Sequence, residues 1–217
     1  MADISTRLQD QVKTARLEGS ELNIVGGGSK VFMGRIGRGS QLDISGHSGI
    51  VSYQPVELVL TARAGTLISD IQATLAEQGQ TLACQPPTFD GNATLGGTLA
   101  CNQSGPARPW CGSIRDHVLG VRLINGKGEH LKFGGQVMKN VAGYDVSRLQ
   151  AGAMGTLGVL TEISLKVLPK PAYSLTLVEA MPLEQAIERM NARASEPKPL
   201  SAACWLDGRL YLRLSGA

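Results

Sequence analysis

The chain has 217 residues and a formal net charge of +3, and it contains 27 glycines against only two Trp, four Tyr and three Phe. Its length suggests one large domain or one domain with part of another, and its hydrophobic fraction of 42% excludes a disordered chain. Scattered basic residues argue against a nucleic-acid footprint, and no apolar stretch approaches the ~18 residues that a membrane span requires.

The first expected elements alternate apolar segments with glycine. Apolar side chains recur every three or four positions over residues 4–15, which predicts an amphipathic helix that ends at Gly19. The apolar segment 22–25 is expected to form a strand, and it runs directly into the glycine loop 26–30, Gly-Gly-Gly-Ser-Lys. A strand therefore leads into backbone that is almost free of side chains.

The next pattern predicts a strand over residues 56–62 and then a helix over residues 66–78. Thr66 is the expected N-cap of that helix, because its hydroxyl can accept from a free N–H of the first turn. Gly79 is expected to end the helix in the left-handed C′ position.

The periodicity fails from Pro86 to Gly112, a segment rich in proline and glycine. Such a long irregular segment inside a compact domain is usually functional. Within it, Thr94 is expected to cap a helix that continues through Ala100, with Gly96 and Gly97 in the first turn.

A hairpin is expected to follow, with strand 118–124, a turn at Asn125-Gly126 and a return strand over 129–133. Asp145 is expected to cap a short helix through Leu149. The glycine cluster 152–158 then leads into an alternating strand, and Pro169-Lys170-Pro171 is the predicted domain boundary.

Beyond that boundary the pattern restarts as β-α-β-β. A strand at 174–178 precedes a helix around 183–190, and a hairpin then turns at Asp207-Gly208. This order is the first part of a split βαβ sandwich, so the unit looks incomplete. Its four arginines are expected to face solvent: Arg189, Arg193, Arg209 and Arg213.

The loop 26–30 has the composition of an anion site, because consecutive glycines let backbone N–H groups converge without side-chain bulk. Ser29 adds a hydroxyl donor and Lys30 a point charge. The loop matches neither the Walker A pattern nor the Rossmann fingerprint. An ordinary glycine turn remains the alternative.

The second and third glycine clusters strengthen the ligand interpretation. A helix that starts at Thr94 offers free N–H groups and a positive dipole end, which suit a pyrophosphate. Close helix packing is the alternative for Gly96 and Gly97, and tight turns are the alternative for residues 152–158. Three such clusters at element boundaries favour one extended dinucleotide over three unrelated turns.

The four cysteines form no CxxC pair and share no ligand-like spacing with the three histidines (Cys84, Cys101, Cys111, Cys204; His47, His117, His130). We therefore expect no metal site. Reduced structural thiols of a cytosolic protein are the simplest interpretation.

Several motifs resemble a known family. They are VGGGSK at 25–30, the proline pair and TLGGTLACNQSG within 86–105, RDHVLG at 115–120 and KNVAGYDVSRLQAGAMGTLGVLTEISLKVLP at 139–169. Together they resemble the FAD-binding domain of the vanillyl-alcohol-oxidase/p-cresol-methylhydroxylase (PCMH) type. Within it, the stretches at 107–120 and 133–145 are most similar to the E subunits of bacterial glycolate oxidases. The resemblance covers essentially the whole chain.

The resemblance implies an α+β fold with a two-subdomain PCMH-type FAD-binding domain at 1–168 and an incomplete ferredoxin-like cap at 172–217. It also implies cofactor contacts. The pyrophosphate would contact Gly26, Gly27, Gly28, Ser29 and Lys30. The flavin and ribityl side would contact Pro87, Thr94, Gly96, Gly97, Ala100 and Ser104, and the backbone of Gly155, Gly158 and Val159 would contact the adenine half. Arg115 and Asp116 either contact the ligand or fix their own loop.

Relatives with covalent flavin carry a His in or beside the first glycine loop, and often a Cys in the second. Here the first loop has no His, although Cys101 and Cys111 lie in the second region. The resemblance therefore implies non-covalent FAD.

The implied function is oxidation of glycolate or a related 2-hydroxy acid to the 2-oxo acid by an FAD-dependent oxidoreductase subunit. Tyr144 and Asp145 are the only catalytic candidates, so we expect a chain that is not competent alone. The expected partners are a catalytic flavin subunit and an iron–sulfur subunit, without direct membrane insertion. A self-sufficient D-lactate-type dehydrogenase and a non-catalytic assembly subunit remain alternatives.

The expected location is cytoplasmic, or peripheral to the inner membrane through the complex. Residues 1–20 include Asp3, Asp10 and Glu18 and show no apolar core of a secretory signal.

Overall fold

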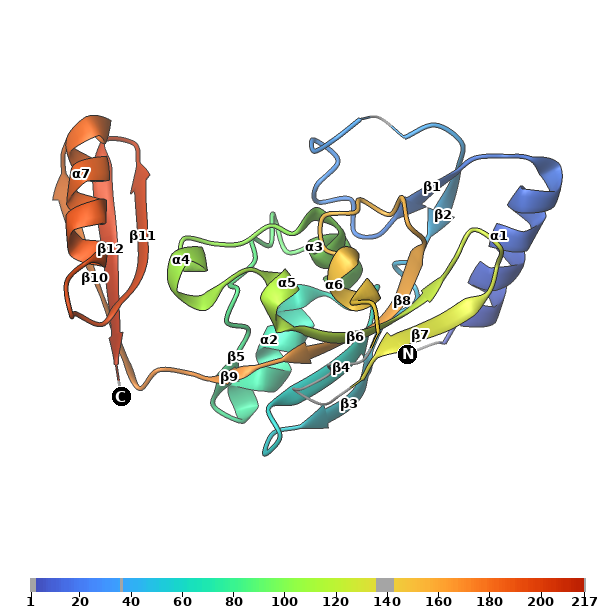
Figure 1. Ribbon diagram of the computed structural model, residues 1–217, viewed down its shortest axis with the longest axis horizontal. Helices are drawn as coiled ribbons and strands as arrows, with labels where there is room; N and C mark the ends of the chain where they lie inside the picture. The colour runs from blue at the N-terminus through green and yellow to red at the C-terminus, as the bar shows by residue number, and fades with distance from the viewer. Residues whose placement is uncertain (1–2, 36, 136–142, 217) are drawn as a thin grey trace.

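The computed structural model describes residues 3–35, 37–135 and 143–216, and it has the predicted α+β fold (Figure 1). The helices are α1 (Ser5–Glu18), α2 (Ile68–Glu77), α3 (Leu95–Cys101), α4 (Arg108–Cys111), α5 (Ile114–His117), α6 (Val146–Leu149) and α7 (Leu183–Ala194). The strands are β1 (Leu22–Val25), β2 (Ser40–Asp43), β3 (Ile50–Gln54), β4 (Val59–Arg63), β5 (Gln80–Thr81), β6 (Val118–Ile124), β7 (His130–Gly134), β8 (Val159–Lys166), β9 (Leu168–Pro169), β10 (Tyr173–Ala180), β11 (Leu200–Leu206) and β12 (Arg209–Gly216).

The N-terminal segment is a helix followed by a parallel pair of short strands. Gly19 ends α1 with a φ of 64°, as predicted, and Leu8 and Val12 bury the apolar face of the helix. β1 pairs in parallel with β2, a strand that the sequence pattern missed. The loop that starts with Gly26 therefore connects two neighbouring parallel strands.

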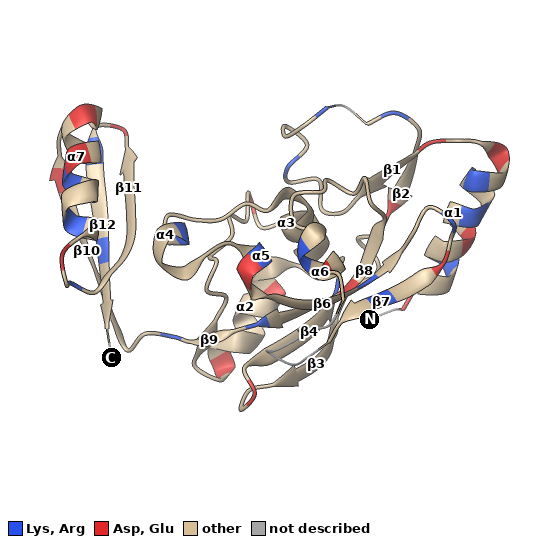
Figure 2. Ribbon diagram, viewed as in Figure 1, with Lys and Arg blue, Asp and Glu red and all other residues tan. Residues whose placement is uncertain are grey.

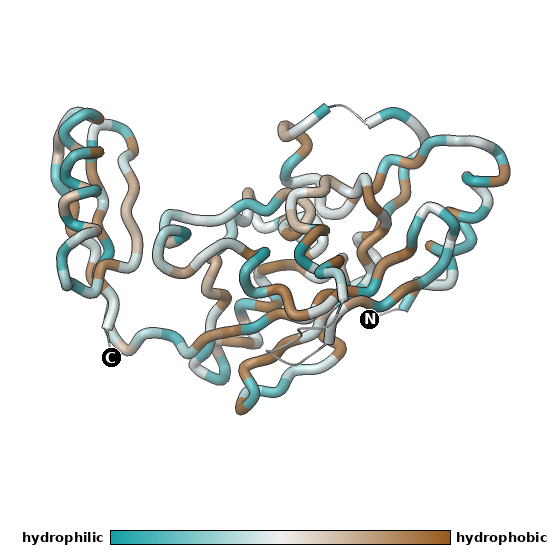
Figure 3. The backbone as a smooth tube through the Cα atoms, in the orientation of Figure 1, coloured by the Kyte–Doolittle hydropathy of each residue, from teal (hydrophilic) through white to brown (hydrophobic). Residues whose placement is uncertain are grey.

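The central sheet has five antiparallel strands in the order β3-β4-β8-β6-β7. The predicted β6–β7 hairpin is confirmed. The middle strand of the sheet, β8, buries Leu160, Ile163 and Leu165, and the tube in Figure 3 shows the apolar run along the central strands. Helices α1, α2, α3 and α5 add side chains to the same core. Among the described residues, no helix has the length and apolar character that crossing a membrane requires.

Two local predictions were wrong. The strand expected from Val56 begins at Val59, because residues 55–58 form the turn of a β3–β4 hairpin. Thr66 is not the cap of α2, whose N-cap is Leu67 without a side-chain bond. The Thr66 hydroxyl instead accepts from the Gly49 N–H at 2.9 Å and so ties α2 to a distant loop.

The C-terminal unit is the predicted β-α-β-β, with strand order β10-β12-β11. Asp207 and Gly208 form its hairpin turn with φ angles of 48° and 76°. Ala186 of α7 packs beneath Leu210, whereas every residue of β10 is exposed. The expectation that Arg213 faces solvent was wrong, because its guanidinium reaches Gln85 across the molecule at 2.9 Å.

Candidate functional site

The glycine loop after β1 lies directly on the segment that enters α3. A Cβ on Gly26 would lie 2.6 Å from Thr94 Oγ1, and a Cβ on Gly27 would lie 1.7 Å from the main-chain oxygen of Asn92. No side chain fits at either position. Close backbone approach between these two loops, at the first two of the predicted site residues, therefore explains these glycines.

Helix α3 begins as predicted, with Thr94 Oγ1 accepting from the Gly97 N–H at 3.3 Å. Gly96 faces the sheet: its N–H donates to Ala64 O at 2.7 Å, and an added Cβ would lie 2.9 Å from Ala64 Cβ. Gly97 is half-buried, and an added Cβ would meet only Thr94 within 4 Å. Close packing thus accounts for Gly96, whereas Gly97 lies on the side away from the sheet contact.

The third glycine cluster packs on the far end of α3. The Gly152 N–H donates to Leu99 O at 3.1 Å and the Met154 N–H donates to Ala100 O at 3.0 Å. A Cβ on Gly155 would lie 3.2 Å from Ile24 of β1. Residues 26–27, α3 and residues 152–155 are therefore neighbours, as the loops around α3 in Figure 1 show.

Two predicted residues lie elsewhere. Gly158 approaches the main chain of β6, where an added Cβ would lie 2.7 Å from Ile124 O, and its φ of 145° favours glycine. Val159 pairs with Ile124 and is buried in the core. The structure places both residues in the sheet, where packing accounts for them.

Lys30 is the main electrostatic feature of the site. Its side chain is 8% exposed, its Nζ donates to Ser29 Oγ at 3.3 Å, and Nζ lies 5.5 Å from the centre of the Phe89 ring. Within the described residues no carboxylate pairs with it, and its loop to β2 carries Arg35 and Arg38 without an acidic residue (Figure 2). Burial lowers the pKa of this ammonium, and the nearby Cys101 thiol opposes the shift. Because an unpaired buried charge is costly, a buried cation of this kind favours the binding of an anion.

The loop that covers Lys30 is strained and aromatic. Phe89 and Phe32 make an edge-to-face contact with ring centres 5.4 Å apart. Gln85, Phe89 and Asp90 all have positive φ, at 42°, 41° and 58°, which non-glycine residues rarely adopt. Such strain clusters at binding sites.

A row of buried polar atoms follows along α3 and its C-terminal loop. Within the described part of the chain, Thr98 Oγ1, Asn102 Oδ1, Gln103 Oε1 and Ser104 Oγ have no hydrogen-bond partner. Ser104 is a predicted site residue and Pro87 lies half-buried in the neighbouring loop. The sequence reasoning missed Thr98, Asn102 and Gln103. The signal was present in the polar run Asn-Gln-Ser after an apolar helix.

Neither of the two catalytic candidates, Tyr144 and Asp145, is placed as a catalytic base would be. Tyr144 is 98% exposed, and the Asp145 carboxylate caps α6 by accepting from the Arg148 N–H at 3.0 Å. Asp116 likewise accepts from Ser113 within a capping box, which fixes its own loop. The first part of the 139–169 motif, residues 139–142, lies outside the described residues.

The cysteines carry no disulfide, and burial raises the pKa of Cys84 to about 12. Across residues 3–35, 37–135 and 143–216, no three His, Cys, Asp or Glu side chains are grouped to hold a metal ion. The burial of Cys84 fits a structural thiol.

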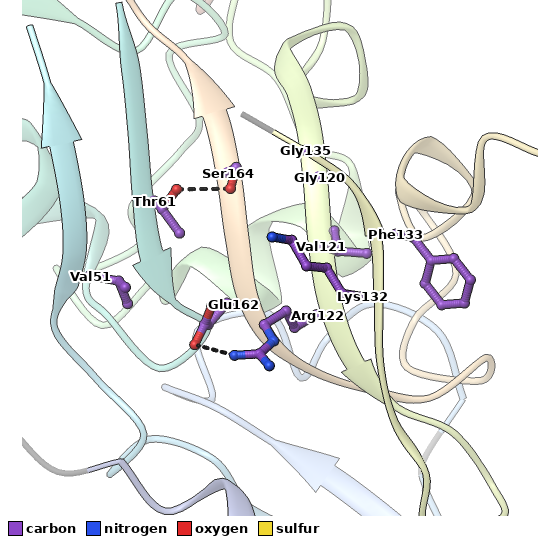
Figure 4. A pocket seen from close by; sticks show the side chains of 10 residues that line it. All are labelled: Val51, Thr61, Gly120, Val121, Arg122, Lys132, Phe133, Gly135, Glu162 and Ser164. Carbon is purple, nitrogen blue, oxygen red and sulfur yellow. Dashed lines mark hydrogen bonds and ion pairs between the residues drawn. The ribbon is translucent and has the colours of Figure 1, made fainter. Parts of the chain in front are cut away.

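A separate hollow of about 70 Å3 lies on the central sheet (Figure 4). Thr61 and Ser164 are hydrogen-bonded at 2.8 Å on one side of it, and Arg122 pairs with Glu162 at 3.5 Å on the other. The hollow is far smaller than the ~300 Å3 of ordinary ligand pockets, and no residue of the glycine clusters lines it. It is not the candidate site.

The residues around α3 fit an extended dinucleotide. In the loop 26–30, Gly28 leaves open space beside its backbone, and Lys30 supplies a buried cation that has no carboxylate partner among the described residues; both suit a diphosphate. The unpartnered polar atoms from Thr98 to Ser104 supply hydrogen-bonding groups farther along the helix. The site thus offers a cation for the diphosphate at the centre of such a ligand and neutral hydrogen-bonding groups for one of the two halves that flank it.

Comparison with known proteins agrees with this geometry. The family described as FAD binding domain matches residues 5–134. The chain is 50% identical to glycolate oxidase subunit GlcE of Escherichia coli over 99% of this chain and 61% of that protein, and 31% identical to a D-lactate dehydrogenase of Anaerostipes hadrus over 74% and 32%. It therefore spans about 61% of the length of the first relative.

A crystal structure of alkyldihydroxyacetonephosphate synthase shares the fold, with a TM-score of 0.76 at 19% identity over 97% of this chain and 45% of that one. The sequence match spans the glycine loop, α3 and the unpartnered polar atoms that follow it. The cofactor that this site fits is FAD, and the chain belongs to the family of FAD binding domains.

Proposed function

We propose that this chain is an FAD-binding subunit of a glycolate-oxidase-type complex, which oxidises glycolate or a related 2-hydroxy acid to the 2-oxo acid. The observation that carries the flavin part is Lys30, a buried lysine with no carboxylate partner among the described residues, in the same loop as Gly26 and Gly27, where no side chain fits. The 50% identity to a glycolate oxidase subunit of Escherichia coli supports the reaction.

The proposed contacts follow the order of elements around α3. Gly26, Gly27, Gly28, Ser29 and Lys30 hold the diphosphate, and Pro87, Thr94, Gly96, Gly97, Ala100 and Ser104 line the flavin and ribityl side. Gly155, Gly158 and Val159 would offer backbone contacts toward the adenine half, since the Val159 side chain is buried in the core. To these we add Thr98, Asn102 and Gln103, whose buried polar atoms have no partner in the described chain. Residues 1–168 would form the FAD domain and 172–217 the partial cap.

The reaction removes a hydride from C2 of the hydroxy acid and a proton from its hydroxyl group, so it needs an electron acceptor and a base. FAD, when bound, supplies the acceptor. The described residues offer no convincing base, because Tyr144 is exposed and Asp145 caps α6. The chain therefore binds the cofactor, and a catalytic flavin subunit of the complex supplies the rest of the substrate site.

Electrons would leave through an iron–sulfur partner, because the described cysteines form no cluster site. The proposed complex is cytoplasmic, or peripheral to the inner membrane. The 31% identity to a D-lactate dehydrogenase supports the second candidate, a self-sufficient 2-hydroxy-acid dehydrogenase.

The visible spectrum of the purified chain with FAD tests the proposal. A flavin band that glycolate or D-lactate does not bleach anaerobically, but that bleaches after the partner subunits are added, is the expected result. Bleaching by the isolated chain would favour the self-sufficient dehydrogenase. A chain that binds no FAD would be an assembly subunit.

The flavin is expected to be held without a covalent bond, because the loop 26–30 and its flanks contain no histidine. Cys101 is half-buried, and burial raises the pKa of its thiol, so little reactive thiolate forms at neutral pH. Acid precipitation of the holoprotein should release all the yellow colour into the supernatant. Flavin that remains with the pellet would contradict this prediction.

A further inference from the structure

Arg213 of β12 connects the C-terminal unit to the loops beside α3. Its Nη1 donates to Gln85 Oε1 at 2.9 Å, its Nε donates to Ser201 Oγ at 3.1 Å and its Nη2 donates to Ser201 O at 3.3 Å. No carboxylate pairs with it among the described residues. Ser201 of β11 therefore holds the guanidinium through two donors, and the third donor binds a neutral side chain 128 positions away.

Gln85 is an unusual place for such a contact. Its φ of 42° is strained for a non-glycine residue, and it stands immediately before Pro86-Pro87. A Cβ on Gly105 would lie 2.6 Å from Gln85 O, and the Gly105 N–H donates to Cys84 O at 3.3 Å. The loops before Pro87 and after Ser104 are thus held against each other at Gln85.

A second contact reaches the loop after Ser104. The Ala203 N–H of β11 donates to Pro106 O at 3.3 Å, and α4 packs against β11. The neighbouring Gln103 and Ser104 carry buried polar atoms without a partner in the described chain. One edge of the C-terminal unit therefore rests on both loops that are proposed to face the flavin.

We propose that Arg213 is a positioning residue for the cofactor site. Acting through Gln85, it holds the strained loop at Pro86-Pro87 and the loop at Gln103–Gly105 in the conformation that binds FAD. The C-terminal unit and the cofactor site are coupled through this contact, so FAD binding and docking of the unit stabilise each other. This inference rests on the proposed flavin function.

The test uses the full chain and measures the dissociation constant of FAD by fluorescence titration. Arg213→Ala and Gln85→Ala should each raise it about tenfold, the size expected for loss of a hydrogen bond to a charged group. The double variant should bind no more weakly than either single variant, because both changes remove the same contact. Gln85→Glu, which keeps an acceptor for Arg213, should bind FAD as the wild type does.

Arg209→Ala is the matched control, because Arg209 is an exposed residue on the same strand. It should leave FAD binding unchanged. If Arg213→Ala unfolds, the Gln85 variants still decide the question. Unchanged binding in Gln85→Ala, or additive losses in the double variant, would overturn the inference while wild-type binding keeps the proposed function. Failure of the wild type and Arg209→Ala to bind FAD would remove the proposed function and this inference with it.

Discussion

Replacing Lys30 with methionine is expected to weaken FAD binding by one to two orders of magnitude and to leave the unliganded chain at least as stable. Lys30 is 8% exposed, and among the described residues its ammonium donates to the Ser29 hydroxyl alone. A hydrogen bond from a charged group contributes about 1.5–3 kcal/mol, which corresponds to roughly 10–150-fold in affinity. Methionine keeps most of the side-chain volume while removing the desolvated charge, so the free energy of unfolding should not fall.

The pH dependence gives the same variant a second signature. Burial lowers the folded-state pKa of Lys30 below its ordinary 10.5, so the unfolded chain binds more protons between the two values. The free energy of unfolding of the apo chain should therefore rise with pH across that interval, and Lys30→Met should remove this part of the rise. Urea unfolding at a series of alkaline pH values measures it.

Lys127→Met is the control, because Lys127 is exposed in the β6–β7 turn. It should change neither the affinity nor the pH profile. Wild-type FAD affinity in Lys30→Met would show that Lys30 does not hold the diphosphate. A marked loss of stability of the unliganded variant would show that Lys30 serves the fold.

Elements with local signals could be predicted from the sequence. Gly19 ends α1, Thr94 caps α3 and Asp207-Gly208 turns the last hairpin, because each signal acts within four residues. Thr66 has the same capping chemistry, yet its hydroxyl bonds to Gly49, 17 positions earlier. A long-range partner of that kind leaves no trace in the local pattern.

The candidate site shows the same division between local and long-range signals. Glycine clusters predicted where the backbone would be bare, and the structure brings the clusters at 26–30, 94–97 and 152–155 together around α3. The clusters could not show which glycines serve packing, since Gly96 and Gly158 contact the sheet. They also gave no sign of Arg213, because its partner Gln85 is 128 positions away.

Gly27→Ala is expected to lower the stability of the chain and to lower its affinity for FAD by tenfold or more. The new Cβ would lie 1.7 Å from the main-chain oxygen of Asn92, and main-chain atoms cannot rotate away as a side chain does. The loop must move off the segment that enters α3. Overpacking typically costs about 1–3 kcal/mol, which lowers the melting temperature of a chain of this size by about 2–4 °C per kcal/mol.

Gly126→Ala separates this effect from the general cost of replacing glycine. Gly126 has no positive φ and no atom within 4 Å of an added Cβ, so alanine there should leave both the melting temperature and FAD binding near wild type. Thermal unfolding and FAD titration of the two variants provide the comparison. If Gly27→Ala bound FAD as tightly as Gly126→Ala, the loop 26–30 would not hold the diphosphate, and Lys30 would need another explanation for its burial. If Gly27→Ala instead weakened FAD binding by more than its loss of stability accounts for, the diphosphate would lie at the loop. The backbone that the new Cβ displaces carries the N–H groups that would bind the diphosphate.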